Sequence, residues 1–516
     1  MGFLIEEASL WPLIVARADA TPDALLALDD RGAQISFAEY RDRAERVAAA
    51  LAERGIGAGD RISWQLPTWI ESMVLAGALA RLGAVQNPIL PILRRREVGF
   101  IVNQVRPRLL IVPPEWNGFD YENMARDVLS EHSSDLMLCD RELPEADLSN
   151  LPPVDAEIRD TSATRWILFT SGTTADPKGV LHNHASLAAA AHGLVLSLGI
   201  DASDSWAMPV PFTHVGGATM LFAFLETGAR GALVERYSDS TPDDLAKMGC
   251  TLAGGGTALV LRYLERQRQR PDVPLFPRLR AAVCGSAPKP AGLHAEVRAE
   301  MGGCGVVSAY GLTEAPLCVS NSPTDDDAAL ALSEGRATPG CEIRVVGQDE
   351  QPCPTGVVGE IRIRGSHLFQ GYLDDSLTAA AFDAEGFFRS GDLGSMDEAG
   401  FIEISGRLKD IIIRNGENIS AKEIEDVLYS HAAVSDAAVI GLPDPRTGER
   451  CCALVVPRDL SEPPTLDELV RHCREAGLAN QKLPERLEIM AELPRNPTGK
   501  VLKHQLRDLY AAVTAE

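Results

Sequence analysis

Hydrophobic positions in the first third of the chain recur with two different periods. Ala, Val and Leu repeat with helical spacing over two segments, and short apolar runs separate them. The pattern predicts helices over Phe37–Arg54, over Ile70–Arg81 and from Val180 onward, and strands over Arg61–Leu66 and Leu109–Val112. Strands that alternate with helices predict an α/β fold of doubly wound, mostly parallel sheets.

The pattern changes after about residue 340. Alternating strand-like segments separated by Gly and Pro predict a small β-rich subdomain, with strands over Glu342–Val346, Glu360–Arg364 and Phe401–Ile404. A second series follows from residue 409, with helices over Lys422–Ser430 and Leu466–Ala476 and strands over Val434–Ile440 and Cys452–Val456. We therefore expect a large N-terminal domain over 1–408 and a small α+β domain over 409–516.

Composition narrows the functional class. The 516 residues are 45% hydrophobic and 24% charged, which is typical of a folded globular protein. Lys and Arg number 49 and Asp and Glu number 73, so the net charge is −24. Such an acidic surface disfavours binding to nucleic acid or to anionic membranes. A small anionic ligand remains compatible, because local cations and backbone amides can bind it.

Cysteine usage and hydropathy point to a cytoplasmic protein. The ten cysteines are scattered and form no CxxC pair, so neither a disulfide framework nor a structural zinc site is expected. No signal peptide is apparent at the N-terminus, and no run of about 18 apolar residues predicts a membrane span.

The densest local signal is the segment Thr170–Gly179, which follows an apolar strand over Trp166–Phe169 and precedes a predicted helix. It combines hydroxyls, glycines and Lys178 within ten residues. Hydroxyls and closely approaching backbone amides suit a polyphosphate, and lysine supplies charge. The spacing is not that of a Walker A loop. A polar surface loop is the alternative interpretation.

Three weaker signals lie further along the chain. Each of them alone is equally typical of an ordinary turn. They are the aromatic, hydroxyl and carboxylate of Tyr310-Gly311-Leu312-Thr313-Glu314, the pair Asp392 and Arg407, and the stiff loop Pro494–Gly499 that presents Lys500.

Together these segments resemble the adenylate-forming superfamily, which includes acyl-CoA synthetases, the adenylation domains of peptide synthetases and luciferases. The same order also contains Pro211–Gly217, Gly285–Pro288 and Asn415–Glu425, so the resemblance covers essentially the whole chain. Two positions depart from the family pattern: Ala175 stands where Gly is usual, and Ala421 stands where Pro is common.

The resemblance implies that MgATP activates a carboxylic acid as an acyl-adenylate, with release of pyrophosphate. It assigns catalytic roles to Lys500, Thr313 and Glu314, with Glu314 also the Mg²⁺ ligand. It assigns the β- and γ-phosphates to Thr170, Ser171, Gly172, Thr173, Thr174 and Lys178. Adenine would lie against Gly285, Ser286, Ala287, Tyr310 and Gly311, and ribose against Asp392 and Arg407.

The resemblance also implies a second half-reaction, in which the C-terminal domain rotates and the thiol of coenzyme A attacks the adenylate. Lys409 occupies the hinge position. Gly416, Glu417 and Asn418 would line the coenzyme A channel. The resemblance is compatible with a homodimer.

The acid itself is expected near His214, Val215 and Gly216 and near Gly254, Gly255 and Gly256. No Asp stands where an amino-acid ammonium would bind, so a bulky apolar acid fits best. The segments Trp64–Trp69 and Gln86–Pro91 look similar to cyclohexanecarboxylate-type and medium-chain acyl-CoA ligases. The alternative is that Gly254–Gly256 is only a tight strand-to-helix turn.

The leading hypothesis is thus an ATP-dependent acid:CoA ligase, AMP-forming, in fatty acid or related metabolism. Two alternatives remain open. One is a stand-alone enzyme that loads an aryl or amino acid onto a carrier protein, and coenzyme A turnover would distinguish it. The other is a non-catalytic nucleotide-binding protein of the same fold, against which Glu314 and Lys500 argue together.

Overall fold

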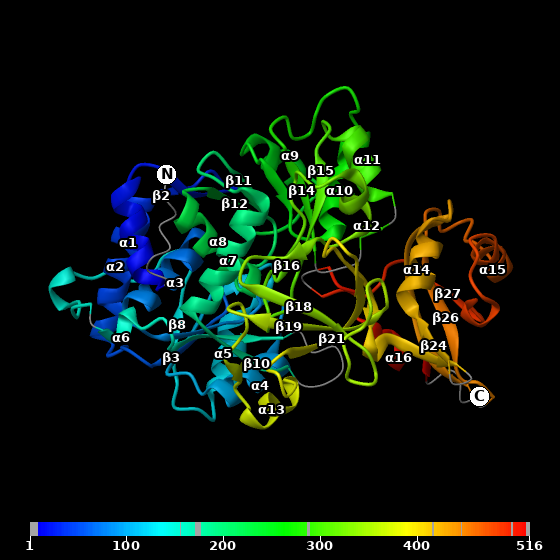
Figure 1. Cartoon of the computed structure of the whole chain (residues 1–516). Coiled ribbons are helices and arrows are strands. Elements are labelled where there is room, and N and C mark those ends of the chain that lie inside the picture. The colour runs from blue at the N-terminus through cyan, green and yellow to red at the C-terminus, as the bar shows by residue number, and fades with distance from the viewer. Residues whose placement is uncertain are drawn as a thin grey trace.

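The computed structural model describes residues 9–154, 156–170, 177–285, 289–290, 292–414, 417–444, 446–496 and 499–511. Two large sheets form its N-terminal part (Figure 1). Within these residues, the first sheet has nine strands in the order β17 (Arg336–Ala337), β16 (Val319–Ser320), β15 (Gly305–Tyr310), β14 (Ala281–Cys284), β13 (Leu252–Gly254), β11 (Ser205–Met208), β12 (Arg230–Leu233), β1 (Leu25–Asp29) and β2 (Gln34–Ser36).

The second sheet has seven described strands in the order β20 (Gly371–Tyr372), β10 (Gly179–Asn183), β9 (Thr164–Phe169), β4 (Val85–Pro88), β3 (Arg61–Trp64), β5 (Leu109–Val112) and β8 (Asp135–Leu138). Both sheets are parallel in their interiors; the first is antiparallel at both ends, and the second is antiparallel at its β20 end and parallel at its β8 end. The predicted mostly parallel α/β architecture is confirmed, and parallel interiors of this kind are buried on both faces by helices.

The helices of the N-terminal part follow the predicted amphipathic pattern. Phe37–Glu53 is helical and begins at a capping box in which Ser36 and Glu39 exchange hydrogen bonds. The helices are α1 (Leu10–Ala20), α2 (Phe37–Glu53), α3 (Ile70–Arg81), α4 (Arg95–Val105), α5 (Tyr121–Leu129), α6 (Ala156–Arg159), α7 (His184–Leu198), α8 (Val215–Thr227), α9 (Thr241–Lys247), α10 (Thr257–Arg268), α11 (Leu293–Glu300), α12 (Asp327–Leu332) and α13 (Thr378–Ala381). A small hairpin joins β6 (Glu115–Trp116) to β7 (Phe119–Asp120).

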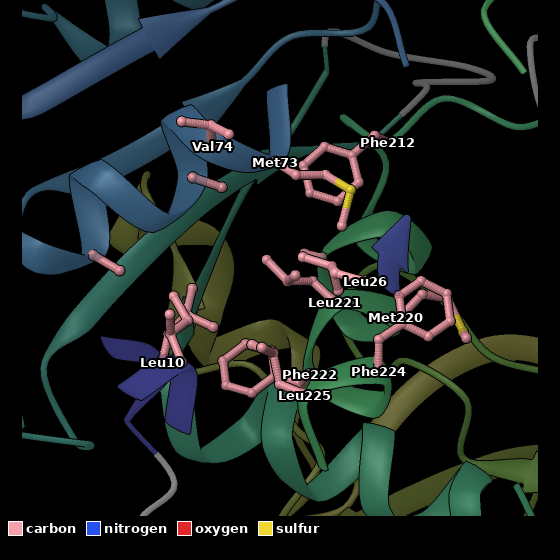
Figure 2. Packing of buried hydrophobic residues seen from close by; sticks show 14 of the residues in the cluster. Leu10, Leu26, Met73, Val74, Phe212, Met220, Leu221, Phe222, Phe224 and Leu225 are labelled. Carbon is pink, nitrogen blue, oxygen red and sulfur yellow. The ribbon is translucent and has the colours of Figure 1, made fainter. Parts of the chain in front are cut away.

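The largest apolar cluster fixes helix α8 in place. Figure 2 shows Met220, Leu221, Phe222, Phe224 and Leu225 of α8 packed with residues of α1, β1 and α3. The labelled side chains are all nearly inaccessible to solvent. Burying each large apolar side chain contributes about 2 kcal/mol, so this cluster holds the N-terminus of α8, where His214 lies, firmly in position.

Two smaller sheets follow, the first antiparallel and the second mixed. The β-rich subdomain contains β18 (Cys341–Val346), β19 (Gly359–Gly365), β21 (Phe388–Met396) and β22 (Ile402–Arg407). The last sheet contains β24 (Glu417–Ser420), β23 (Ile411–Arg414), β26 (Gly448–Pro457), β25 (Val434–Asp444) and β27 (Arg486–Ile489), with helices α14 (Ala421–Tyr429), α15 (Leu466–Glu475) and α16 (Lys503–Ala511). In Figure 1 these orange and red elements gather at one end of the molecule.

The helix predicted from Val180 onward is wrong at its start. Gly179–Asn183 is a strand, β10, which pairs antiparallel with β9 and β20, and the helix begins only at His184. The Asn183 side chain accepts a hydrogen bond from the Ser186 backbone and caps this helix. The segment 170–178 therefore joins two antiparallel strands rather than a strand and a helix.

All ten cysteines are free thiols. In the described part of the chain, no helix has both the length and the apolar character that crossing a bilayer requires.

The backbone at Gly254, in the turn before α10, leaves no room for a side chain. Its φ is +137°, and a Cβ there would lie 2.1 Å from the Val283 carbonyl oxygen. Gly32 also has positive φ, +88°, but a Cβ there meets no atom within 4 Å. We expect Gly254→Ala to lose more than about 2 kcal/mol of unfolding free energy and Gly32→Ala only about 1 kcal/mol. Equal shifts in thermal unfolding would contradict this account.

Candidate active site

A cleft of about 770 Å³ lies between the N-terminal sheets and the C-terminal elements. The ends of β14 and β15, helix α10, strand β22 and the loop before α16 all contribute to its walls. Seven of the residues predicted from sequence line it: Gly285, Tyr310, Gly311, Asp392, Arg407, Lys409 and Lys500. Residues far apart in the chain thus converge on one concave surface, as in most ligand sites.

Asp392 is a buried carboxylate in the wall of this cleft. It lies on β21 opposite Arg407 of β22, and its side chain is only 3% exposed. Arg407 Nε lies 2.6 Å from Oδ1, and the Tyr310 hydroxyl donates to Oδ2 over 2.7 Å. Burial and the Asp392 charge raise the pKa of Tyr310, so its hydroxyl remains a donor. These two partners fix the carboxylate between the end of β15 and the start of the C-terminal segment.

Lys500 reaches the same cleft from the loop between β27 and α16. Asn496 closes this loop: its side-chain oxygen accepts from the Lys500 backbone NH over 2.9 Å, and its own NH donates to the Lys500 carbonyl over 2.8 Å. Burial, followed by the neighbouring charges of Arg407 and Lys409, lowers the pKa of Lys500 to about 7, although Asp392 and Asp410 oppose the shift. The local charge balance therefore favours an incoming anion.

Thr313 and Glu314 do not line this cleft; they lie in the turn that follows β15. The Glu314 carboxylate accepts from the Tyr372 hydroxyl over 2.8 Å. His182 Nε2 lies 2.7 Å from the Thr313 carbonyl oxygen, and His182 Nδ1 lies 2.8 Å from Ser186 Oγ. Burial lowers the pKa of His182 to about 4, so the neutral ring donates from Nε2 to the carbonyl and accepts at Nδ1.

The predicted phosphate loop is described only at its two ends. Ser171, Gly172, Thr173 and Thr174 lie outside the described residues. The Thr170 backbone NH donates to the Lys178 carbonyl over 3.0 Å, and the Lys178 NH donates to Thr170 Oγ1 over 3.2 Å. Lys178 Nζ lies 4.8 Å from the centroid of the Tyr372 ring, a cation–π distance. The two ends of the loop are therefore joined to each other, and Lys178 lies beside Tyr372, the residue that donates to Glu314.

The predicted acyl-pocket residues lie away from this cleft, in two turns. His214 caps α8 by accepting from the Gly216 NH, and Val215 begins that helix. Burial alone lowers the pKa of His214 to about 4, so the ring is neutral. Gly254 and Gly255 have positive φ, and Gly256 is extended before α10. A tight strand-to-helix turn thus accounts for Gly254 without reference to any ligand.

Three of the remaining predicted positions lie at the start of the C-terminal elements. Lys409 lies in the short 3₁₀ turn Leu408–Asp410, and its pKa is lowered by burial and by Arg407. Glu417 and Asn418 belong to strand β24, which pairs with β23. Ser286, Ala287 and Gly416 lie outside the described residues.

Sequence reasoning missed two residues that organise the site. Tyr372 holds Glu314, and Asn496 holds the Lys500 loop. Asn496 has a detectable signal, because Asn-Pro-Thr-Gly is a turn sequence whose first side chain commonly bonds the backbone ahead of it. Tyr372 has no comparable signal, since its role follows only from the pairing of β20 with β10.

No group of three or more His, Cys, Asp or Glu side chains that could hold a metal occurs among the described residues. Glu314 is a single carboxylate, held at one oxygen and 9% exposed. One protein carboxylate is the donor set that suits Mg²⁺ shared with substrate phosphates, because Mg²⁺ keeps most of its coordination for water and phosphate.

Comparison with known proteins assigns the class. The model of the AMP-binding enzyme family matches residues 14–373, and the model of its C-terminal domain matches residues 423–500. The chain belongs to this family of AMP-binding enzymes. It is accordingly an AMP-forming acid–CoA ligase with the adenylate-forming fold.

Two curated relatives show how widely the acids differ at similar identity. The medium-chain fatty-acid–CoA ligase of Escherichia coli is 33% identical, over 99% of this chain and 92% of that protein. The sulfoacetate–CoA ligase of Cupriavidus necator is 31% identical, over 96% and 97%. One acid is apolar and the other carries a sulfonate, so identity at this level does not define the acid.

Solved structures of relatives with and without bound ATP can be compared with this chain. ATP-bound MatB from Rhodopseudomonas palustris superposes with a TM-score of 0.88 at 28% identity, over 98% of this chain and 99% of that one. Apo MatB, with the same coverage and identity, gives 0.76. The o-succinylbenzoate CoA synthetase of Bacillus subtilis with ATP and magnesium gives 0.83 at 28% identity, over 96% and 99%. The arrangement with Lys500 in the cleft is therefore more similar to an ATP-bound relative than to its apo form.

The lowered pKa of Lys500 predicts a pH effect on the free enzyme. The protonated amine is the form that attracts an anion, and it is lost as pH rises through about 7. Because kcat/KM reports ionisations of the free enzyme, kcat/KM for ATP should fall up to tenfold per pH unit above this value. In Lys500→Arg this alkaline limb should vanish, whereas Lys247→Arg on the surface should keep it. A wild-type profile that stays flat to pH 9 would contradict the assignment.

Proposed function

We propose that the enzyme makes an acyl-adenylate at the cleft and then an acyl-CoA thioester, from a bulky apolar acid of alicyclic or medium-chain type. The observation that carries the proposal is that Lys500 enters the same cleft as Tyr310 and the Asp392–Arg407 pair. A loop lysine, an aromatic ring and a carboxylate paired with arginine are then presented to one ligand.

In the first half-reaction the acid's carboxylate attacks the α-phosphorus of ATP, and pyrophosphate leaves. Lys500 would lie between the carboxylate and phosphate oxygens and offset the negative charge that gathers there. Thr313 would contact the α-phosphate, and Glu314 would hold the Mg²⁺ that neutralises phosphate charge when bound. The loop between Thr170 and Lys178 would meet the β- and γ-phosphates.

The nucleoside would be held by residues already ordered in the protein. The Tyr310 ring would stack on adenine beside Gly285 and Gly311, which line the same wall of the cleft. Asp392 would accept from the ribose hydroxyls, with Arg407 paired to that carboxylate. A site already held in its binding geometry loses less freedom when the ligand enters.

The apolar acid is supported by the surroundings of His214. Burial is the one cause of its lowered pKa, so no charged side chain acts on it strongly. The helix that follows is largely buried from Val215 through Leu225, and Thr219 is the one polar side chain in that stretch. Such a neutral environment favours an uncharged acyl body and disfavours an ammonium or a sulfonate. Because the acids of the two relatives differ, the proposal of an apolar acid depends on the site and not on the relatives.

The second half-reaction would follow rotation of residues 409–516 about Lys409. Strand β22 ends at Arg407, directly before the turn Leu408–Asp410, so a change of backbone angles there would move the whole C-terminal sheet. Rotation would remove Lys500 from the cleft and bring the Gly416–Asn418 hairpin to the acyl-adenylate.

A panel of acids tests the function directly. Release of AMP and pyrophosphate from MgATP would be measured with and without coenzyme A, using cyclohexanecarboxylate, linear acids of several lengths, benzoate, a polycyclic acid and amino acids. We expect coenzyme A-dependent turnover with alicyclic or medium-chain acids. Lys500→Ala should lose at least about two decades in adenylate formation, and Lys247→Ala none.

Other outcomes of the panel would overturn parts of the proposal. Pyrophosphate release without thioester formation would indicate a carrier-protein acceptor. Turnover restricted to amino acids or sulfonates would contradict the apolar pocket. ATP binding with no pyrophosphate release from any acid would indicate a binding protein.

The hinge is tested by separating the two half-reactions. Lys409→Pro restricts the backbone at the turn, so it should leave adenylate formation within about threefold and block thioester formation. Lys409→Gln removes the charge but not the backbone freedom, so it should leave the ratio of the two steps unchanged. Single-turnover measurement of adenylate and thioester would show this, and equal loss of both steps in Lys409→Pro would count against the hinge.

A further inference from the structure

The turn Thr313–Glu314 is held from behind by side chains that do not line the nucleotide cleft. The His182 ring donates to the Thr313 carbonyl, and the Phe369 backbone NH donates to the Glu314 carbonyl over 2.9 Å. The backbone of the pair is thereby fixed on both carbonyls. The orientation of the Glu314 carboxylate is the freedom that remains.

Tyr372 removes that freedom. Its hydroxyl lies 2.8 Å from Glu314 Oε1, and among the described residues it is the one donor to this carboxylate. Tyr372 is itself 3% exposed. Its hydroxyl donates to Oε1, which leaves Oε2 for another ligand.

The ring of Tyr372 connects this carboxylate to the predicted phosphate loop. Strand β20 pairs with β10 so that Tyr372 lies opposite Val180, and the Leu373 NH donates to the Gly179 carbonyl over 2.7 Å. Lys178, one residue before β10, places its ammonium over the Tyr372 ring. One side chain thus contacts both the carboxylate and the lysine that are predicted to meet the phosphates.

We propose that Tyr372 is a positioning residue that orients the Glu314 carboxylate toward the magnesium–nucleotide complex and couples it to Lys178. The inference rests on the proposed role of Glu314. Partners that orient a metal-binding carboxylate typically change metal affinity by 10- to 100-fold when removed. The hydroxyl should therefore affect magnesium-dependent nucleotide binding more than it affects folding.

The ring and the hydroxyl of Tyr372 can be separated by mutation. The ring packs against Phe369, with centroids 4.9 Å apart, and belongs to the apolar cluster of the β-rich subdomain. Tyr372→Phe keeps this packing and the cation–π contact and removes only the hydrogen bond. Tyr40→Phe is the matched control, because Tyr40 is also fully buried and its hydroxyl donates to the Met73 carbonyl.

The experiment measures ATP affinity by titration calorimetry with and without Mg²⁺ on the full chain. We expect the gain in affinity from Mg²⁺ to fall about tenfold in Tyr372→Phe and to stay unchanged in Tyr40→Phe. On a Glu314→Gln background, Tyr372→Phe should cause no further fall, because the two residues act as one unit. Melting temperatures of the two Tyr→Phe variants should be similar.

Three outcomes would overturn the inference: a normal Mg²⁺ effect in Tyr372→Phe, an equal further fall on the Glu314→Gln background, or no Mg²⁺ effect in the wild-type protein. Failure of the proposed function has a different signature. In that case Mg²⁺ strengthens ATP binding in the wild type through Tyr372, but no acid of the panel releases pyrophosphate.

Discussion

The central physical constraint of this molecule is a concentration of positive charge in a cleft of an acidic protein. The chain carries a net charge of −24, yet Arg407, Lys409 and Lys500 approach one another beside Asp392 and Asp410. Removing an ammonium from water without a full counter-charge costs free energy, and the lowered pKa values of both lysines express that cost. An anionic ligand would relieve it, so the architecture around the cleft stabilises the bound state more than the free one.

Strand pairing and one loop contact keep the groups around the cleft in place. Parallel strands β14 and β15 end at the same edge of their sheet, which brings Gly285 and Tyr310 together. Strand pairing of β21 with β22 sets Asp392 opposite Arg407. Asn496 gives Lys500 its loop conformation. The side chains that line the cleft thus come from strands on one side and from the loop before α16 on the other.

Much of the fold follows from the sequence because local periodicity and capping agree with the tertiary structure. Helix α3 has the predicted bounds, and α2 differs by one residue, since apolar spacing defines both helices and a capping box begins α2. Strand β10 was not predicted, because Val180 and Leu181 run directly into the apolar residues of α7; only Asn183 marks the boundary.

Some residues of the site could also be predicted from the sequence, and others could not. The order of the motifs indicates which residues meet in the cleft. Gly285 and Tyr310 meet because β14 and β15 end at one edge of their sheet, whereas Asp392 and Arg407 meet because β21 pairs with β22 in another sheet. Tyr372 could not be found from sequence, because its importance depends on pairing with a strand far away in the chain. Gly254 was interpreted as part of a pocket wall, but a neighbouring carbonyl 2.1 Å from its missing Cβ explains the glycine by itself.

The shifted ionisation of Lys500 has a consequence for the energetics of substrate capture. With its pKa near 7, about half of the free molecules at neutral pH hold a neutral amine in the cleft. A bound polyanion restores the ammonium, and the missing proton must come from the solution. Nucleotide capture by this enzyme is therefore also a proton uptake, and the measured heat of binding contains the ionisation enthalpy of whichever buffer supplies that proton.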